Sequence, residues 1–448
     1  MDRRDFFKFG LGGAGLTIGE SLTGSSDSDS SLSGNHEFDH PWWVNRLEEP
    51  KLPVDDRVYS RFNSRKNVFG SMVKYYGMKN LKELRERSQK KTQRYYRENR
   101  PGYRLQDRAL ADAGWVISRL GGLNRGTRSW TRNFVRTPQQ RGVEEYKGSL
   151  GEAAHMIKAA ARYFGAATVG ITRLDRRHIN AKERGKRIVF EGVEEPYGNK
   201  EKLVIPDKCK YAVSMSVQMS LDNIACSPTA LSSAGSSMGY SRCEFLVAGL
   251  TEFIRGLGYV AIPSVNDLGS SVAPAVDAGL GELGRTNRLI TPEFGPMVRL
   301  CKVLTDLPLA VDKPIDFGLL EFCKVCKRCA EACPCNCLSF EDEPSFEVKG
   351  PWNNPGHKAW FEDSPQCLAY WQESTSGCSN CLRVCPWTKK DKTVIHQIIK
   401  GASAKIPALD AFFTSMDESF GYGRQRSARK WWDLNLPEYG VDTTQGKG

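Results

Sequence analysis

The cysteines of this chain constrain its fold more than any other feature, because ten of the 14 lie between Cys323 and Cys385. The first run in that stretch is Cys323-x-x-Cys326-x-x-Cys329-x-x-x-Cys333-Pro334, the spacing with which bacterial ferredoxins bind a [4Fe–4S] cluster. Zinc also binds CxxC pairs, but the Cys-Pro ending, which occurs twice, favours iron–sulfur. The sequence therefore predicts an iron–sulfur unit over residues 318–388.

A second set of cysteines repeats the ending of the first run after a longer gap. It consists of Cys367, Cys378, Cys381 and Cys385, the last followed by Pro386. In two-cluster ferredoxins the last cysteine of each run ligates the other cluster. We therefore predict that one cluster is held by Cys323, Cys326, Cys329 and Cys385. The second cluster is predicted to be held by Cys333, Cys367, Cys378 and Cys381.

Two further cysteines, Cys335 and Cys337, depart from this pattern just after the first run. Either thiol could replace Cys367 in the second cluster, or both could be buried thiols packed beside the clusters, and the spacing leaves this open. The other four are isolated in the sequence, which is typical of small core residues. They are Cys209, Cys226, Cys243 and Cys301.

The N-terminus carries a signal of a different kind. Arg3 and Arg4 begin a twin-arginine pattern, and a short, weakly apolar, Gly-rich stretch follows from Phe9 to Ile18. A charged head with a short apolar stretch predicts export rather than a membrane span. With its Ser- and Asp-rich linker the segment covers residues 1–34, and no clear A-x-A cleavage site marks its end. No apolar run approaches the ~20 residues that a membrane span needs.

The formal net charge, +12 at pH 7, is compatible with nucleic acid, an anionic surface or a solvated basic exterior. The stretch 79–100 holds nine basic and three acidic side chains together with Tyr95 and Tyr96. Because acids are interleaved and no nucleic-acid-binding motif is present, we expect a solvated surface helix and no nucleic-acid partner.

The middle of the chain alternates between helical and strand patterns. Two helices are expected, at 150–164 and 246–257, and three strands, at 167–171, 211–217 and 259–262. Residues 173–208 are charged and poor in periodicity, which suggests an inserted hairpin. This alternation over residues 148–262 predicts a layered α/β core.

The segment from Gly279 to Gly284 matches the G-x-G-x-x-G pattern of dinucleotide-binding loops. It lacks the preceding apolar strand and the following amphipathic helix, so NAD or FAD binding is not expected. A tight turn that uses the conformational freedom of glycine would explain it. A loop that closely approaches a large planar cofactor would also explain it, which makes Gly279 and Gly281 candidate cofactor contacts.

Several of these features, in this order, resemble the corrinoid-dependent respiratory reductive dehalogenases. They are the twin-arginine signal, the helix–strand unit 150–174, the segment Ser237-Met238-Gly239-Tyr240-Ser241, the segment 278–287 and the two cysteine motifs. The glycine-rich segment also resembles epoxyqueuosine reductases, a cobalamin and iron–sulfur family in which an export signal is not expected.

The resemblance implies a nitroreductase-like α/β (α+β) core that binds a cobalamin-type corrinoid, followed by a ferredoxin-like unit with two [4Fe–4S] clusters. None of the six histidines lies in the D-x-H-x-x-G motif with which many corrinoid proteins ligate cobalt. The corrinoid is therefore expected in the base-off form. Tyr370 and Trp371 are candidate neighbours of the corrin ring.

The active-site pattern of the family falls on Tyr240, Asn266 and Arg299, and the resemblance gives each a role. Tyr240, expected at the start of a helix, would donate the proton in R–X + 2e⁻ + H⁺ → R–H + X⁻. Arg299 would stabilise the resulting phenolate, and Asn266 would orient the substrate or the halogen. Without the resemblance, a core tyrosine, a turn asparagine and a paired arginine would explain the three residues.

These expectations divide the chain into five parts. They are the signal and linker (1–34), an N-terminal helical unit (35–132), the corrinoid-binding core (133–317, with its insertion at about 173–209), the two-cluster unit (318–388) and a C-terminal extension (389–448).

The resemblance also implies partners and a location. The substrate would be a small organohalide, which we predict to be a chlorinated ethene, and a quinone or hydrogenase complex would supply electrons. The protein would lie on the outer face of the cytoplasmic membrane, held by a small membrane-anchor protein. An alternative from a different class is an exported two-cluster electron carrier without catalysis of its own. Such a protein would contain iron but no cobalt.

Overall fold

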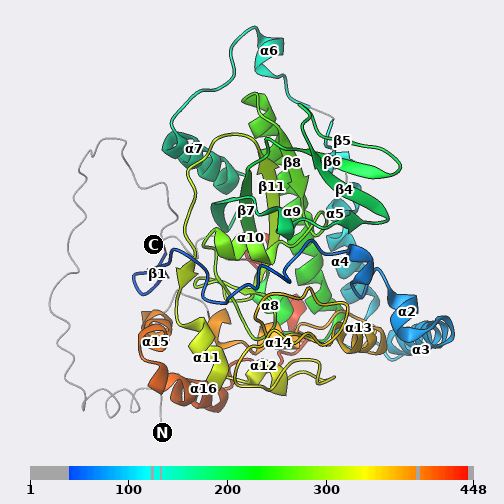
Figure 1. Ribbon diagram of the computed structural model, residues 1–448. Coiled ribbons are helices and arrows are strands. Elements are labelled where there is room, and N and C mark those ends of the chain that lie inside the picture. Colours follow the sequence, from blue (N-terminus) through cyan, green and yellow to red (C-terminus); the bar gives the residue numbers. More distant parts are fainter. Residues whose placement is uncertain (1–39, 123–125, 132–133, 390–393, 442–448) are drawn as a thin grey trace. The chain divides into compact units, whose positions relative to one another are not determined.

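A four-stranded antiparallel sheet forms the core of the computed structural model, which describes residues 40–122, 126–131, 134–389 and 394–441 (Figure 1). The strand order is β2-β7-β11-β8, so strands distant in sequence lie side by side. The strands are β2 (Thr168–Arg173), β7 (Tyr211–Gln218), β8 (Ala261–Ser264) and β11 (Val298–Thr305). Strands β7 and β11 pair over their full length, from Gln218 opposite Val298 to Tyr211 opposite Thr305.

The structure confirms the three predicted strands and adds a fourth. Strand β8 begins at Ala261, two residues later than the pattern indicates. Strand β11 is not evident from the sequence, because Arg299 and Lys302 interrupt its apolar residues with charge. This strand nevertheless lies in the middle of the sheet, between β7 and β8.

One face of the sheet is covered by helices α7 (Leu150–Tyr163) and α9 (Ala230–Gly256). Val213 and Met215 of β7 pack there in one apolar cluster with Ile157 of α7 and Leu250 of α9. Helix α7 confirms the predicted helix, and a capping box in which Ser149 and the third helical residue exchange hydrogen bonds fixes its start.

Helix α9 begins much earlier than the sequence indicates. Thr229 caps it, and its first half is rich in Ala, Ser and Gly, which give no apolar periodicity. Only the second half, with Leu246 and Leu250, shows the helical stripe. The expectation that Tyr240 starts a helix was therefore wrong, since ten helical residues precede it in α9.

The other face of the sheet is covered by the insertion, which is a small sheet rather than a hairpin. Its strand order is β3-β4-β6-β5. The strands are β3 (Lys182–Glu183), β4 (Lys186–Glu191), β5 (Tyr197–Gly198) and β6 (Lys202–Pro206). Strands β4 and β6 run parallel, which a tight hairpin turn cannot produce. Ile188 and Leu203 from this sheet pack with Ala212, Ile262 and Leu304 of the core.

The N-terminal region contains several helices. They are α2 (Met72–Tyr76), α3 (Met78–Arg97), α4 (Leu105–Gly114) and α5 (Val116–Leu120), followed by the short helix η2 (Gly126–Arg128). Helices α4 and α5 contact α9. In α3 the buried residues are Leu81, Leu84 and Tyr95, which confirms the predicted solvated surface helix.

The cysteine-rich region is built from short helices and loops. They are α11 (Leu319–Val325), α12 (Arg328–Glu331), α13 (Ser364–Glu373) and α14 (Asn380–Arg383), with α15 (Val394–Lys405) and α16 (Asp410–Ser419) after them. Helix α12 of the first run contacts α14 of the second, so the two runs lie side by side. A mixed α/β core followed by such a region is the coarse architecture that the sequence predicts.

The predicted twin-arginine segment lies outside the described residues. The described residues form one compact unit, and the boundaries predicted within it, after residues 132, 317 and 388, stay predictions. Within the described ranges, no helix has both the length and the apolarity to cross a bilayer.

Candidate active site

A cavity of about 680 Å³ lies where the core, the N-terminal helices and the cysteine-rich region meet. Its lining combines Trp115 and Arg128 from the N-terminal region with Tyr240 of α9, Arg299 of β11 and Cys378 from the cysteine-rich region. Segments distant in sequence thus line one cavity.

Tyr240, Asn266 and Arg299 meet in this cavity. The Asn266 amide donates a hydrogen bond of 2.7 Å from Nδ2 to the Tyr240 hydroxyl. The Arg299 guanidinium lies over the Tyr240 ring, with Cζ 4.8 Å from the ring centroid, and Nη2 donates to Ser236 Oγ at 3.0 Å. The structure therefore places the phenol between a neutral amide and a permanent cation, as a positioned proton donor would require.

The ring of Tyr240 is also held by packing. Trp115, at the junction of α4 and α5, stacks on it with centroids 5.2 Å apart and an interplanar angle of 19°. Gly239 makes room for the neighbouring arginine, because a Cβ at this position would lie 2.9 Å from Arg299 Cγ. The sequence gives no motif for Trp115, so only the fold reveals it as part of the site.

The four cysteines predicted to hold the second cluster all line the same cavity. They are Cys333, Cys367, Cys378 and Cys381. Burial raises the pKa of the Cys378 thiol to about 12, and the neighbouring thiols of Cys381, Cys367 and Cys333 act in the same direction. The four thiols therefore lie near one another in the cavity wall.

The four cysteines predicted for the first cluster gather outside the residues that line the cavity. Cys323, Cys326 and Cys385 pack in one cluster with Phe322 and Trp387. Burial raises the pKa of Cys329, and the nearby thiols of Cys323 and Cys385 add to that effect. Cys385 thus lies near Cys323 and Cys326, whereas Cys329 also packs in one cluster with Cys333, Cys367 and Cys381. The role of all eight as cluster ligands stays a prediction.

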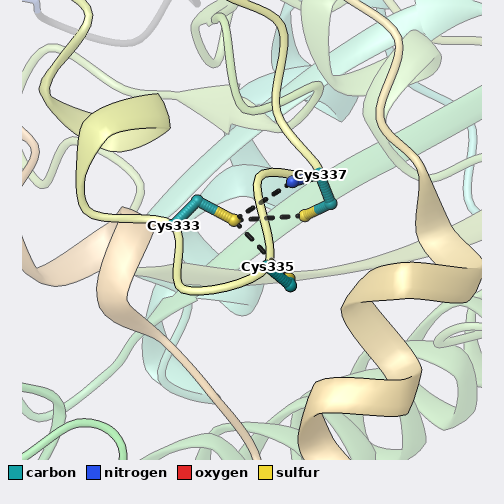
Figure 2. A group of neighbouring side chains, drawn as sticks. All are labelled: Cys333, Cys335 and Cys337. Atoms are coloured by element: carbon teal, nitrogen blue, oxygen red, sulfur yellow. Dashed lines mark hydrogen bonds between the residues drawn. The ribbon is translucent and has the colours of Figure 1, made fainter.

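The two additional cysteines lie beside Cys333, as Figure 2 shows. The Cys333 sulfur is 3.7 Å from that of Cys335 and 3.3 Å from that of Cys337. The backbone N–H of Cys337 also donates to the Cys333 sulfur at 3.4 Å. Both thiols therefore reach the second set, and the choice between either of them and Cys367 as the fourth ligand stays open. The four isolated cysteines are buried core residues, as expected: Cys209, Cys226, Cys243 and Cys301.

Two of the four candidate cofactor contacts line the cavity. Tyr370 and Trp371 of α13 are part of its wall. Gly279 and Gly281 are not among the lining residues; a Cβ on them would lie 2.3 Å from the Lys313 carbonyl oxygen and 2.1 Å from that of Ile290. Close backbone packing explains these two glycines, so we leave them out of the cofactor site that we propose.

A charged pair in the cavity wall is not evident from the sequence. Arg288 pairs with Glu362 at 2.8 Å, and both line the cavity near Cys367 and Cys381. The glutamate, aided by the two thiols, raises the pKa of Arg288, which stays charged beside them. A fixed positive charge near sulfur ligands is one of the factors that set the potential of an iron–sulfur cluster.

A mixed α/β core whose cavity is lined by cysteines from two ferredoxin-like runs is typical of an iron–sulfur redox protein. The profile of one family, described as reductive dehalogenase subunit, matches residues 39–186 and 184–309, more than half of the chain. The chain belongs to the reductive dehalogenase family.

Relatives of the chain carry more specific names. The tetrachloroethene reductive dehalogenase of Sulfurospirillum multivorans is 38% identical over 307 residues, which cover 65% of this chain and 61% of that protein. The chloroethene reductive dehalogenase of Dehalococcoides mccartyi (strain VS) is 26% identical, with 99% of this chain and 98% of the relative covered. For several relatives, the first of these included, the chain spans about 60% of their length.

The fold is similar to that of a solved reductive dehalogenase, described as suggesting a mechanism for B12-dependent dehalogenation. The similarity has a TM-score of 0.65 at 25% sequence identity, and it covers 89% of this chain and 51% of the other. The mixed α/β fold is therefore that of the family.

Proposed function

We propose that this protein is a reductive dehalogenase that replaces a halogen of an organohalide, a chlorinated ethene in our proposal, by hydrogen. The reaction is R–X + 2e⁻ + H⁺ → R–H + X⁻, so the site must supply two electrons and one proton and release a halide. The observation that carries the proposal is that Tyr240, Asn266 and Arg299 line the same cavity as the second set of cysteines. The names of the relatives support the choice of substrate.

The cavity fits a corrinoid on three observations. Trp371 and Arg299 line the cavity, and their Nε1 and Nε atoms are buried without a hydrogen-bond partner in the described part of the chain. The aromatic side chains of Tyr370 and Trp371 offer flat walls to a planar ring. Among the described residues that line the cavity none is a histidine, which suits the base-off form. When bound, a reduced corrinoid supplies the electron pair that breaks the carbon–halogen bond.

The side chains of this chain would handle the proton and the substrate. Tyr240 gives its hydroxyl proton to the carbon that has lost the halide, because a phenol protonates a strongly basic carbanion-like species readily. Arg299, over the ring, stabilises the phenolate that remains. Asn266 fixes the hydroxyl by its 2.7 Å hydrogen bond and presents an uncharged amide to the substrate.

The cysteines would bring electrons to the same place. Cys333, Cys367, Cys378 and Cys381 would hold one [4Fe–4S] cluster in the cavity wall. Cys323, Cys326, Cys329 and Cys385 would hold the other beside it, away from the cavity lining. Electrons would then pass from an upstream donor through the outer set to the inner set, one at a time.

We also propose the location and the partners that the sequence indicates. The twin-arginine segment supports export of the folded, cofactor-loaded chain to the outer face of the cytoplasmic membrane. A small membrane-anchor protein would hold it there, and a quinone or hydrogenase complex would reduce it. The net charge of +12 would add attraction to anionic lipid.

The decisive experiment is anaerobic purification with cobalt, iron and acid-labile sulfide quantified, followed by chloride release from tetrachloroethene. We expect one cobalt and about eight iron per chain, eight being two four-iron clusters. Iron without cobalt would favour the electron carrier, and zinc at the cysteines would exclude both redox functions. Cobalt and iron with reduction of epoxyqueuosine, and no chloride release, would favour the other cobalamin family.

A further inference from the structure

A buried network of four charged residues adjoins the cavity of the proposed proton donor, and Arg128 and Asp267 of this network are part of the cavity lining. It contains Arg128, Glu244, Asp267 and Lys302, whose exposed fractions are 8%, 1%, 5% and 1%. They come from four elements: η2, α9, the loop after β8, and β11. Two cations balance two carboxylates, in surroundings where an unpaired charge would be strongly unfavourable. Nothing in the proposed reaction so far uses this network.

Arg128 joins the two carboxylates. Its Nη1 donates to Asp267 Oδ2 at 2.7 Å, and its Nε lies 3.0 Å from Glu244 Oε2. Glu244 follows Tyr240 by one turn of α9, and Asp267 is the residue after Asn266. One guanidinium therefore ties the helix that presents the phenol to the loop that presents the amide.

The loop that carries the amide is further restrained from within. Asp267 Oδ1 accepts from the Val265 N–H at 3.1 Å, and Ser271 Oγ donates to the Val265 carbonyl at 2.9 Å. Lys302 Nζ donates to Ser271 Oγ at 3.0 Å and to the Gly269 carbonyl at 3.3 Å. These bonds, with backbone hydrogen bonds from Asn180 to Leu268 and from Ser270 to His178, hold the loop on the core, and Arg128 links it to α9.

We propose that Arg128 is a positioning residue that sets the contact between the Asn266 amide and the Tyr240 hydroxyl, and with it the direction of proton donation. The inference rests on the proposed function. It gives the N-terminal region a part in the reaction, because η2 supplies the guanidinium that aligns groups on two other elements. A misplacement of ~1 Å in an active site can lower the rate about 10²-fold.

The first test is Arg128→Lys in the full-length, cofactor-loaded protein. Lysine keeps the charge but lacks the planar fork that reaches both carboxylates. With tetrachloroethene and a chemical reductant, we expect kcat to fall about 10-fold or more, with KM and the cobalt and iron contents unchanged.

Arg162→Lys is the matched control. Arg162, in α7, is a partly buried arginine that donates to the Ala166 carbonyl at 2.8 Å, and it does not line the cavity. We expect a comparable loss of thermal stability but a kcat within about two-fold of wild type, because a destabilising change away from the site should leave the geometry of the site unchanged. An equal fall in kcat for both variants would overturn the inference.

A double-mutant cycle separates positioning from general weakening. If Arg128 acts through Asn266, then Arg128→Lys should cause little further loss in an Asn266→Ala background, whereas independent effects would multiply. Multiplying effects would overturn the inference. Should Arg128→Lys fail to fold, Glu244→Gln replaces it in the same cycle. Failure of the proposed function would look different: Tyr240→Phe and Asn266→Ala would both keep the wild-type rate, and the positioning role would fall with it.

Discussion

The two walls of the cavity are built in different ways. The cysteine wall comes from two short runs whose spacing already groups the thiols, and a bound cluster would itself cross-link them. The opposite wall takes Tyr240, Asn266 and Arg299 from three elements, with Trp115 and Arg128 from the N-terminal region. Stacking, hydrogen bonds and ion pairs hold these side chains in place.

This difference explains where each wall is vulnerable. A metal centre concentrates the binding energy in a few ligands, so the loss of one thiolate removes the whole centre. The Tyr240 wall distributes its restraints over hydrogen bonds, a stacked ring and buried charges, and a single change there leaves the rest in place. The expected effects of substitution therefore decrease from the first wall to the second.

The largest effect is expected when a predicted cluster loses a ligand, whether in the cysteine wall or in the outer set of cysteines. Cys326→Ser should remove one cluster and Cys381→Ser the other, because oxygen replaces a soft thiolate poorly, and iron should fall from about eight to four per chain. Dehalogenation should become undetectable in both variants. Iron and sulfide analysis with EPR of the reduced protein would check this, and retention of all eight iron atoms in either variant would contradict the ligand assignment.

The next effect concerns the opposite wall. Tyr240→Phe keeps the ring and its stacking on Trp115 but deletes the acidic proton. Corrinoid content, both clusters and reduction of cobalt to Co(I) should persist, while turnover falls by about 10²–10⁴-fold, the usual share of a general acid. Steady-state chloride release measures it. A rate within a factor of about three of wild type would refute the role of Tyr240 as donor.

A smaller effect is expected at the cation beside the phenol. Arg299→Lys keeps the charge near Tyr240 but loses the planar donors that also reach Ser236, so turnover should fall by about 10-fold. Arg299→Met, which removes the charge, should be markedly slower than Arg299→Lys. Equal rates for the two variants would show that the charge of Arg299 does not stabilise the phenolate.

The smallest effect is expected at the additional thiols. Cys335→Ser and Cys337→Ser should leave iron content near that of wild type, whereas Cys367→Ser should lose the second cluster. Because the Cys337 sulfur lies 3.3 Å from the Cys333 sulfur, this comparison tests Cys337 directly as an alternative to Cys367. A harmless Cys367→Ser together with cluster loss in Cys337→Ser or Cys335→Ser would move the fourth ligand to that residue.

The sequence by itself determined what depends on local spacing. The two cysteine runs, the helix at 150–164 and the strands at 167–171 and 211–217 are all visible as patterns, since neighbours in the chain are neighbours in these elements. The helical start of α9 was missed for the same reason, because small residues leave no apolar period to recognise. Tyr240, Asn266 and Arg299 could be named only through the resemblance to a family.

Only the tertiary structure decided which distant residues share the cavity. The insertion became a sheet with a parallel strand pair, Gly279 and Gly281 packed against backbone away from the lining, and Trp115 and Arg128 entered the site from helices without a motif. Such contacts follow from how amphipathic faces and buried charges find partners across the fold, and a linear sequence records each partner but not the pairing.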